Sequence, residues 1–323
     1  MTSHRSGTFV LAIAAALGLA ACSSHSAAPL LPSVAEPQRL LTAGPNTGFG
    51  SWAYTCLVST DGCPLYTVSG TSPTLYENAN INGNPVGEFA TTAGNWYVAL
   101  KTMYQVVVYK STASGPTGPY LTLNDPNEIP DDVTVNTAHK MVVVGHLYTE
   151  SGNRMSMSVF LNGAKTPTKK LYFSAPGGKG GYGIGVATDS SGNCYFSVDD
   201  AGLLKFDVVK FTACGGSGKI VYTSAADTSA GGLALDGSNN LYFVDTTDEY
   251  IYRCKGTSSC KVLAKGFQGI IFVRFDAGWK HLWTTDGKAS KLYALNPTTG
   301  AVLSSTTEIN SAGSLALAPG PAY

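Results

Sequence analysis

The sequence is poor in charged residues and has no excess of either sign. Lysine and arginine together number 21, aspartate and glutamate also number 21, and these residues fill 13% of the 323 positions. A balanced chain of this kind lacks the strongly basic face with which proteins bind nucleic acid, and no polybasic tract points to an anionic membrane. We therefore expect no nucleic-acid partner.

Short catalytic motifs are missing as well. The chain has no GxSxG, no HExxH and no Ser/His/Asp spacing of the kind that hydrolases use. The glycine-rich stretch 175–185 is not followed by a helix, as a phosphate-binding loop would be, so we interpret it as a connection. No cofactor is firmly implied, although a bound Ca²⁺ or other divalent ion stays open.

Residues that favour strands and tight turns are abundant. The chain contains 37 Gly, 16 Pro and 17 Tyr, and its hydrophobic share of 44% is ordinary for a globular core. This composition favours strands over helices. Closed all-β folds often use this much chain as one domain, so we expect an all-β protein.

The N-terminus has the pattern of an export signal. His4 and Arg5 precede an apolar run from Phe9 to Ala21, which is too short to span a bilayer. The run ends in LAAC, residues 19–22, which resembles the lipobox of bacterial lipoproteins. The resemblance implies that residues 1–21 are a lipoprotein signal peptide and that Cys22 is acylated. The alternative is a plain signal peptide with a chance cysteine.

An acylated Cys22 implies a membrane partner and an address. Several acyl chains would hold the protein firmly, since one chain binds only marginally. Ser23 and Ser24 follow the cysteine, which by analogy favours the outer membrane of the cell envelope if the cell has one, and otherwise the cell surface. Residues 22–48 are rich in Ser, Ala and Pro, so we interpret them as a flexible tether to a domain at 49–323.

An internal repeat runs through this domain. GVATDSSGNCYFSVDD (185–200) aligns with GLALDGSNNLYFVDTTD (232–248) and with VRFDAGWKHLWTTDG (273–287), and 132–148 is a weaker copy. Two further strand patterns follow each copy, so that four strands fill about 40–50 residues, which is typical of a β-propeller blade. The pattern resembles the NHL-repeat propellers, and this resemblance covers about 180–300.

The repeat count predicts six four-stranded blades. Five of them are expected near 91–125, 129–175, 182–225, 231–266 and 269–307. SLAL (314–317) aligns with GLAL (232–235), so we expect it to be the inner strand of a sixth blade whose other strands come from 49–90. Strands from both termini would then close the ring and remove its free edge. Five or seven blades remain as alternatives, and we expect a monomer.

Six cysteines besides Cys22 favour disulfides in an exported protein. Zinc is the alternative, but its ligands usually come in short pairs near histidine, and the chain has no CxxC. The blade pattern places the cysteines opposite one another on adjacent strands or across short turns. It predicts three pairs: Cys56–Cys63, Cys194–Cys214 and Cys254–Cys260.

Polar residues recur where one face of the propeller should lie, at connections from second to third strands and from outer strands to the next blade. The candidate rim or channel residues are Asp131, Asp132, His146, Asp199, Asp245, Gln268 and Asp286. Such carboxylates could bind a divalent cation or carbohydrate hydroxyls. The alternative is that Asp after a strand is a turn residue that binds its own backbone.

Two functions follow from these features. The first is a lipid-tethered propeller that binds an unknown protein or glycan and has no catalytic activity. The second is a metal-dependent hydrolase or lyase that acts at the central channel, as implied by a resemblance to gluconolactonase-type propellers. Their cation cage cannot be mapped onto individual residues of this chain, so the sequence favours the binding module.

Overall fold

A computed structural model of the chain describes residues 52–56, 61–149, 154–306 and 313–322. The chain divides into two compact units, Met1–Gln38 and Arg39–Tyr323, and every described residue belongs to the second. The regular structure of the described ranges consists of strands and two 3₁₀ turns, η2 (Thr212–Cys214) and η3 (Ala277–Trp279). No helix in those ranges is long and apolar enough to cross a membrane.

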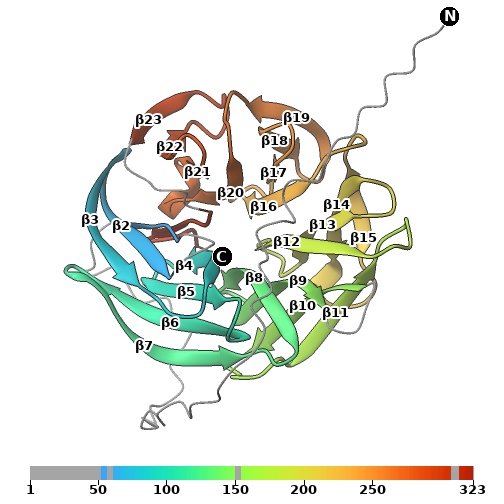
Figure 1. Cartoon of the computed structure of the whole chain (residues 1–323), viewed down its shortest axis with the longest axis horizontal. Helices are drawn as coiled ribbons and strands as arrows, with labels where there is room; N and C mark the ends of the chain where they lie inside the picture. The colour runs from blue at the N-terminus through green and yellow to red at the C-terminus, as the bar shows by residue number, and fades with distance from the viewer. Residues whose placement is uncertain (1–51, 57–60, 150–153, 307–312, 323) are drawn as a thin grey trace, which may run out of the picture. The chain divides into compact units, whose positions relative to one another are not determined.

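The strands form six four-stranded antiparallel sheets, which we call blades (Figure 1). Blade 1 contains β4 (Pro85–Ala90), β5 (Asn95–Leu100), β6 (Gln105–Thr112) and β7 (Gly115–Asn124). Blade 2 contains β8 (Glu128–Asn136), β9 (Met141–Thr149), β10 (Arg154–Leu161) and β11 (Lys169–Ser174). Blade 3 contains β12 (Gly181–Thr188), β13 (Cys194–Asp200), β14 (Lys205–Phe211) and β15 (Lys219–Thr223).

The remaining blades complete the ring. Blade 4 contains β16 (Ala230–Leu235), β17 (Leu241–Asp245), β18 (Tyr250–Lys255) and β19 (Ser258–Ala264). Blade 5 contains β20 (Ile270–Phe275), β21 (Leu282–Asp286), β22 (Lys291–Leu295) and β23 (Val302–Thr306). Blade 6 contains β24 (Ala316–Ala318), β1 (Trp52–Tyr54), β2 (Gly62–Ser69) and β3 (Ser72–Asn80). Inner strands contact one another in turn, and β24 contacts β4.

Blade 6 confirms the predicted ring closure by both ends of the chain. Its strand order is β24-β1-β2-β3, and β24 pairs with β1 so that Trp52 faces Ala318 and Tyr54 faces Ala316. Two hydrogen bonds then join blade 6 to blade 1. The Trp52 indole donates to the Thr112 carbonyl at 2.9 Å, and the Tyr54 hydroxyl donates to Ser111 at 2.6 Å. The six-bladed fold is therefore closed by side chains as well as by strands.

One predicted boundary was wrong. β4 is the inner strand of blade 1 and begins at Pro85, whereas we expected that blade to begin near residue 91. The turn after β4 lacks the aspartate that is found in the equivalent turns of blades 3, 4 and 5. Thr91 stands there instead, and its hydroxyl accepts a hydrogen bond from the Asn95 N–H at 3.1 Å. The repeat signal is weak at this blade because a different residue caps the turn.

The repeated aspartate of blades 3, 4 and 5 caps the turn between first and second strands. Asp189 accepts hydrogen bonds from the N–H groups of Ser191 (3.0 Å) and Asn193 (2.9 Å). Asp236 and Asp276 accept equivalent bonds from their own turns. A short carboxylate that binds its own backbone stabilises a tight turn. The repeat motif is thus explained by folding alone.

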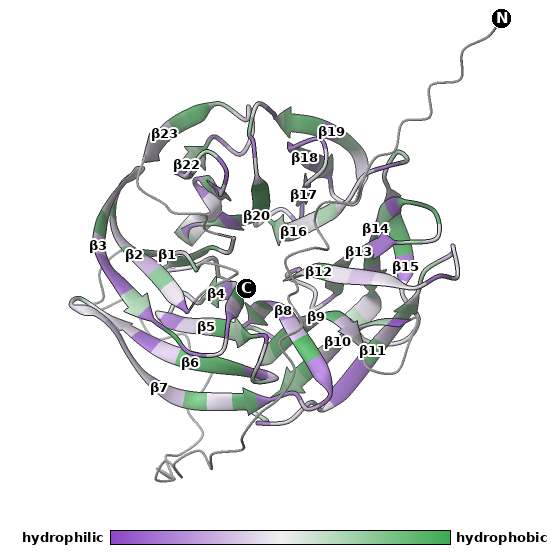
Figure 2. Cartoon of the chain, viewed as in Figure 1, coloured by the Kyte–Doolittle hydropathy of each residue, from purple (hydrophilic) through white to green (hydrophobic). Residues whose placement is uncertain are grey.

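The core lies between neighbouring blades. Second strands such as β5 and β17 are buried at every position, because each is covered by blades on both sides. At the closure the Tyr54 ring stacks on Trp96, with ring centroids 4.2 Å apart. In Figure 2 much of the inner strand β20 has the green of hydrophobic residues, and Arg274 is its one charged residue. Burying one such large apolar side chain contributes about 1.5–3 kcal/mol.

All three predicted disulfides are present, with Cα–Cα distances between 3.8 and 4.9 Å, and they join Cys56 to Cys63, Cys194 to Cys214 and Cys254 to Cys260. Because strands in each blade are antiparallel, successive connections alternate between the two faces of the ring. We call the face that carries the connections between second and third strands the upper face, and the opposite one the lower face. The first disulfide lies at the upper face and the other two at the lower face.

Candidate functional site

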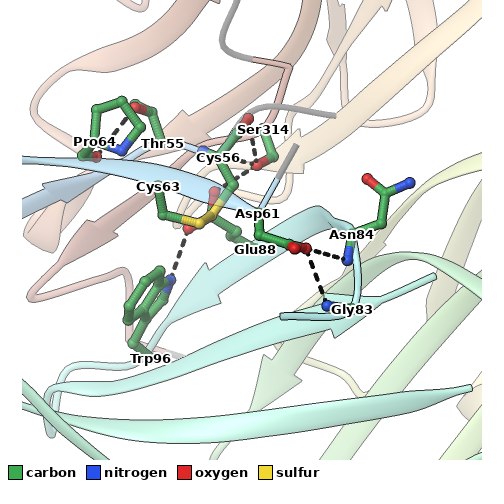
Figure 3. The surroundings of a disulfide bond; sticks show 10 residues. All are labelled: Thr55, Cys56, Asp61, Cys63, Pro64, Gly83, Asn84, Glu88, Trp96 and Ser314. Carbon is green, nitrogen blue, oxygen red and sulfur yellow. Dashed lines mark hydrogen bonds between the residues drawn. A yellow bond between two sulfur atoms is a disulfide. The ribbon is translucent and has the colours of Figure 1, made fainter. Parts of the chain in front are cut away.

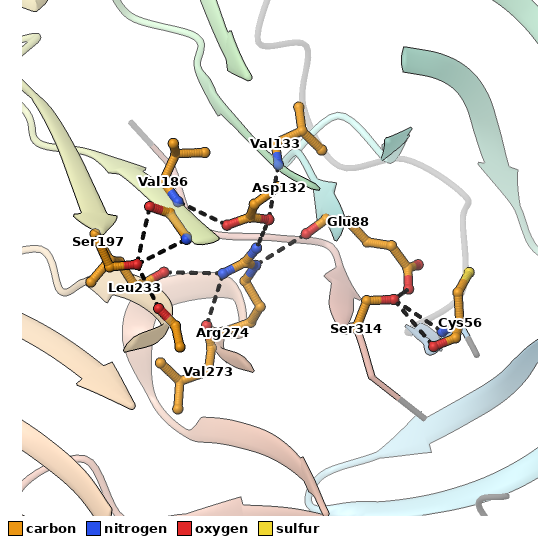
Figure 4. A network of polar contacts seen from close by, with 12 residues as sticks. Cys56, Glu88, Asp132, Val133, Val186, Ser197, Leu233, Val273, Arg274 and Ser314 are labelled. Carbon is orange, nitrogen blue, oxygen red and sulfur yellow. Dashed lines mark hydrogen bonds and ion pairs between the residues drawn. The ribbon is translucent and has the colours of Figure 1, made fainter. Parts of the chain in front are cut away.

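Arg274 on β20 lies at the centre of the ring and links four blades (Figure 4). Its Nη2 forms an ion pair with a carboxylate oxygen of Asp132 on β8, and both side chains are almost completely buried. Its Nε donates to the Glu88 carbonyl at 3.0 Å, and Nη1 donates to the Leu233 carbonyl at 3.0 Å. Through these contacts the guanidinium of Arg274 lies on the axis of the propeller and joins its inner strands.

Asp132 is the acidic partner in this arrangement. Its second carboxylate oxygen accepts a hydrogen bond from the Val186 N–H of blade 3 at 2.9 Å. Burial raises the pKa of Asp132 to about 6, although Arg274 and two backbone N–H groups act to lower it. The sequence placed Asp132 before an inner strand. It lies inside β8, where a break in the register with β9 turns its side chain toward the axis.

Gly87 makes the approach of blades 1 and 2 possible at this point. A Cβ atom on Gly87 would lie 2.3 Å from the Asp131 carbonyl oxygen and 2.4 Å from the Asp132 Cα. Real Cβ atoms do not approach backbone so closely, so only glycine fits beside Asp132. The position of the acidic side chain at the axis therefore depends on a glycine in the neighbouring blade.

Glu88 is a second buried acid, at the closure of the ring (Figure 3). Its carboxylate accepts hydrogen bonds from the Trp96 indole at 2.7 Å and from the Ser314 hydroxyl. Ser314 also accepts a hydrogen bond from the Cys56 N–H at 3.2 Å. Burial raises the pKa of Glu88 to about 7, against these hydrogen bonds, which lower it. Glu88 thus ties blade 1 to both chain ends that build blade 6.

A cavity of about 20 Å³ lies on the lower side of Arg274. Phe89, Leu233 and Pro321 contribute to its lining. The Thr188 hydroxyl, which also lines it, is buried and has no hydrogen-bond partner. A cavity of this size holds about one water molecule. The space beside Arg274 on this side therefore fits a solvent molecule.

Asp131 lies beside Asp132 but remains partly exposed. Burial of its carboxyl, followed by the charge of Asp132, raises the pKa of Asp131 to about 8, while Lys101 acts to lower it. Asp199 behaves similarly in blade 3. Its carboxylate accepts a hydrogen bond from the Ala230 N–H at 2.6 Å, and burial raises its pKa to about 7. Asp131 lies on the inner strand β8, and Asp199 lies near the end of β13, at the upper face.

Asp245 and Asp286 cap turns of the upper face. Asp245 ends β17 and accepts hydrogen bonds from the Thr247 and Asp248 N–H groups at 3.0 and 3.1 Å. Asp286 ends β21 and accepts a hydrogen bond from the Ala289 N–H at 2.9 Å. Its other oxygen accepts the N–H of Gln268, another predicted rim residue, at 2.8 Å. These contacts support the turn interpretation for both aspartates.

His146 does not lie at the rim where the sequence placed it. It is completely buried inside blade 2, on β9. One ring nitrogen lies 2.8 Å from Asp125 Oδ2, and the other lies 2.7 Å from Ser156 Oγ. Glu128 accepts a hydrogen bond from the same Ser156 hydroxyl at 3.1 Å. In the register of β8 and β9, His146 lies opposite Pro130. Its side chain is enclosed by Asp125 and Ser156 and does not reach solvent.

This Asp125–His146–Ser156 arrangement was missed by sequence reasoning, because its members come from a loop and two separate strands. It has the order of a catalytic triad. However, all three residues are completely buried, and the Ser156 hydroxyl already donates to Glu128. A nucleophile must reach its substrate, so we interpret the arrangement as a structural polar network. Lys170, whose Nζ lies 3.2 Å from Glu128, completes it.

Comparisons with known proteins show the fold of the chain, and they assign it to no family. No family model and no curated protein matches the chain. A crystal structure of a nidogen/laminin complex matches with a TM-score of 0.62 and 15% identity, over 83% of this chain and 98% of that one. A functionally unknown protein from Desulfotomaculum acetoxidans matches at 0.56 and 8%, over 82% and 98%. The chain is a β-propeller.

An enzyme also has this fold. A catalytically inactive virginiamycin B lyase from Staphylococcus aureus, in complex with quinupristin, matches with a TM-score of 0.52 and 16% identity, over 81% of this chain and 85% of that one. Identity at this level indicates a shared fold and carries no function across. The chemistry that is possible at the axis must therefore be inferred from the side chains of this chain.

The acids of the axis and rim do not converge. Within the described ranges no group of three or more His, Cys, Asp or Glu side chains has a geometry that could hold a metal ion. Asp132 is paired with Arg274, and Glu88 with Ser314 and Trp96. Each of these acids is committed to joining blades. The axis therefore holds acidic groups that join blades and that can titrate.

Proposed function

We propose that the protein is an envelope-anchored lipoprotein whose propeller is a binding module without catalytic activity, and whose partner is a protein or a glycan. The observation that carries this proposal is the closed axis. Arg274 lies at the centre of the ring and pairs with one carboxylate oxygen of Asp132, while the other oxygen accepts the Val186 N–H. Both oxygens of this central acid are thus already engaged. Binding must then use the surface of the propeller.

The upper rim offers suitable contacts for a partner. Tyr182 is 51% exposed and faces Asp199 in the pairing of β12 with β13. Gln268 is exposed near the start of blade 5. An exposed aromatic ring such as that of Tyr182 can stack on a sugar or pack against a protein side chain, and an exposed amide such as that of Gln268 can form hydrogen bonds with it. The nidogen/laminin structure supports the idea that a propeller of this shape serves in a complex of proteins.

The anchor and the absence of activity are tested separately. Labelling with a palmitate analogue should mark the wild-type protein and should not mark Cys22→Ser, which should leave the membrane fraction. Hydrolysis or elimination of a panel of lactones and esters should stay at background with and without added Ca²⁺. Turnover that disappears in Asp132→Asn or Asp131→Asn would overturn the binding proposal in favour of a channel enzyme.

A further inference from the structure

Two turns of the upper face expose pairs of bulky apolar residues. The turn between β5 and β6 exposes Met103 (46%) and Tyr104 (37%), and the turn between β13 and β14 exposes Leu203 (48%) and Leu204 (58%). In the equivalent turns of blades 4 and 5 the last two positions hold Asp248–Glu249 and Ala289–Ser290. The fold therefore accepts polar residues at these positions, and it does not require apolar ones.

The backbone makes these apolar residues still less expected. The last residue of each of the four turns has a left-handed conformation, with φ of +55° at Tyr104, +52° at Leu204, +56° at Glu249 and +52° at Ser290. Glycine and asparagine adopt this conformation more readily than large side chains do. An exposed tyrosine and an exposed leucine at strained positions are therefore better explained by a contact than by folding.

Both turns are held in place by the neighbouring loop. The Asp125 N–H donates to the Tyr104 carbonyl at 2.9 Å, and the Asp227 N–H donates to the Leu204 carbonyl at 2.6 Å. These equivalent bonds fix the last residue of each turn. A pre-organised contact loses less conformational entropy when it binds than a mobile loop does.

The charged residues near these turns differ from blade to blade. Lys101 opens the first turn, and Lys205 directly follows the second. Asp227, next to Leu204, is an exposed acid beside the second turn. The turn of blade 4, by contrast, carries Asp248 and Glu249. Blades 1 and 3 thus each combine an apolar tip with a lysine. In blade 4, Asp248 is exposed, and the Glu249 carboxylate lies 3.8 Å from Lys288 Nζ of blade 5.

We propose that Met103, Tyr104, Leu203 and Leu204 form a membrane-contact surface that rests on an anionic lipid bilayer. Leucine and tyrosine side chains enter the boundary between headgroups and acyl chains, and adjacent lysines bind lipid phosphates. Each tip has its own lysine, and the tips belong to blades 1 and 3 with blade 2 between them. A fluid bilayer accepts such separate tips, whereas a protein partner needs one continuous complementary surface.

An acylated Cys22 would hold the propeller close to a bilayer, and this inference therefore rests on the proposed function. The turn of blade 4 carries the exposed Asp248 and no apolar tip, so we do not expect blade 4 to approach the bilayer. Gln268 opens blade 5, across the ring from blade 2, and therefore stays accessible to a partner.

Binding to vesicles tests the proposal without the lipid anchor. A chain that starts at Arg39 keeps the whole second compact unit and lacks both the apolar leader and Cys22. Its melting temperature should equal that of the full chain. We expect it to co-sediment with vesicles of phosphatidylethanolamine and phosphatidylglycerol, and Leu203→Ser with Leu204→Asn should weaken this binding about tenfold or more. Asparagine suits the left-handed position, so this variant should remain folded.

Two further variants sharpen the result. Val302→Ser with Leu303→Ser removes equally exposed apolar residues (54% and 46%) from the outer strand β23, and it should leave vesicle binding unchanged. Asp227→Asn removes the acid beside the second tip and should strengthen binding about fivefold.

Absence of vesicle binding by the Arg39–Tyr323 chain, or equal losses in the Leu203/Leu204 and Val302/Leu303 variants, would overturn the proposal. So would a photo-crosslinker at position 203 of the full chain that yields a protein adduct and no lipid adduct. None of these outcomes bears on palmitate labelling of Cys22 or on turnover, so failure here is distinguishable from failure of the proposed function.

Discussion

At the scale of single residues, buried carboxyls give the protein an unusual pH dependence. Burial raises the pKa of Glu88 from its ordinary value of 4.5 to about 7. Between these two values the folded protein binds more protons at this site than the unfolded chain does. Stability therefore falls as the pH rises through this window, and the shift corresponds to about 3 kcal/mol. The raised pKa values of Asp131 and Asp199 act in the same direction.

We predict that the melting temperature is higher at pH 5 than at pH 8. Glu88→Gln keeps an acceptor for Trp96 and cannot ionise, so it should raise the melting temperature at pH 8 and flatten the pH profile. Glu77 lies exposed on β3 and provides a matched control, since Glu77→Gln should leave the profile unchanged. A profile that is equally steep in Glu88→Gln would assign the pH dependence to other groups.

The Arg274–Asp132 pair should be strongly coupled. Removing one member leaves an uncompensated buried charge, so Arg274→Met and Asp132→Asn should each lower the free energy of unfolding by about 3–5 kcal/mol. The double variant should lose much less than the sum of the two. Urea unfolding of all four proteins measures the coupling. Additive losses would contradict a direct role of the pair in joining the blades.

This pair could not be predicted from the sequence. Arg274 lies in the strand VRF, where an alternating polar residue looks like ordinary surface, and Asp132 is 142 residues away. Asp189 and Asp236 were predictable because their hydrogen bonds lie within their own turns. Contacts across the axis depend on how the blades meet, and a repeat pattern describes only one blade at a time.

At the scale of elements, the three disulfides should differ in their contributions. Cys194–Cys214 closes a loop of 20 residues, while Cys56–Cys63 and Cys254–Cys260 close loops of 7 and 6. In the chain-entropy description longer loops gain more, which gives about 3 kcal/mol for the first and about 2 kcal/mol for each of the others. Alanine replacement of each pair, followed by denaturant unfolding, checks this order. A largest loss at either short loop would contradict it.

Element boundaries were predictable where the turn after the inner strand begins with aspartate, or with Asn136 in blade 2, and the prediction failed for blade 1. Blades 3, 4 and 5 start within one residue of their expected positions, whereas blade 1 starts six residues early, at Pro85. In that blade Thr91 replaces the aspartate. The position of His146 inside blade 2 was not predictable either, because the pattern of β9 is apolar on both sides and gives no sign of a buried polar network.

At the scale of the whole molecule, stability depends on closure by the two chain ends. Removal of residues 314–323 deletes β24 and Ser314, so β1 loses its inner neighbour and the Glu88 carboxylate loses the Ser314 hydroxyl. We expect a large drop in melting temperature together with aggregation through the opened edge. Removal of residues 322–323 alone is the control and should change little, since Ala322 is exposed. A 314–323 deletion that melts like the intact protein would contradict the closure.

The central claim is that the axis joins the blades and does not hold a catalytic metal ion. Calorimetric titration of Ca²⁺ into the full chain, in parallel with the Asp132→Asn variant, tests it most directly. We predict that any heat of Ca²⁺ binding is the same in both proteins, because the carboxylate oxygens of Asp132 already bind Arg274 and the Val186 N–H. Saturable binding in the wild type that disappears in Asp132→Asn would contradict it and would place a metal site at the axis.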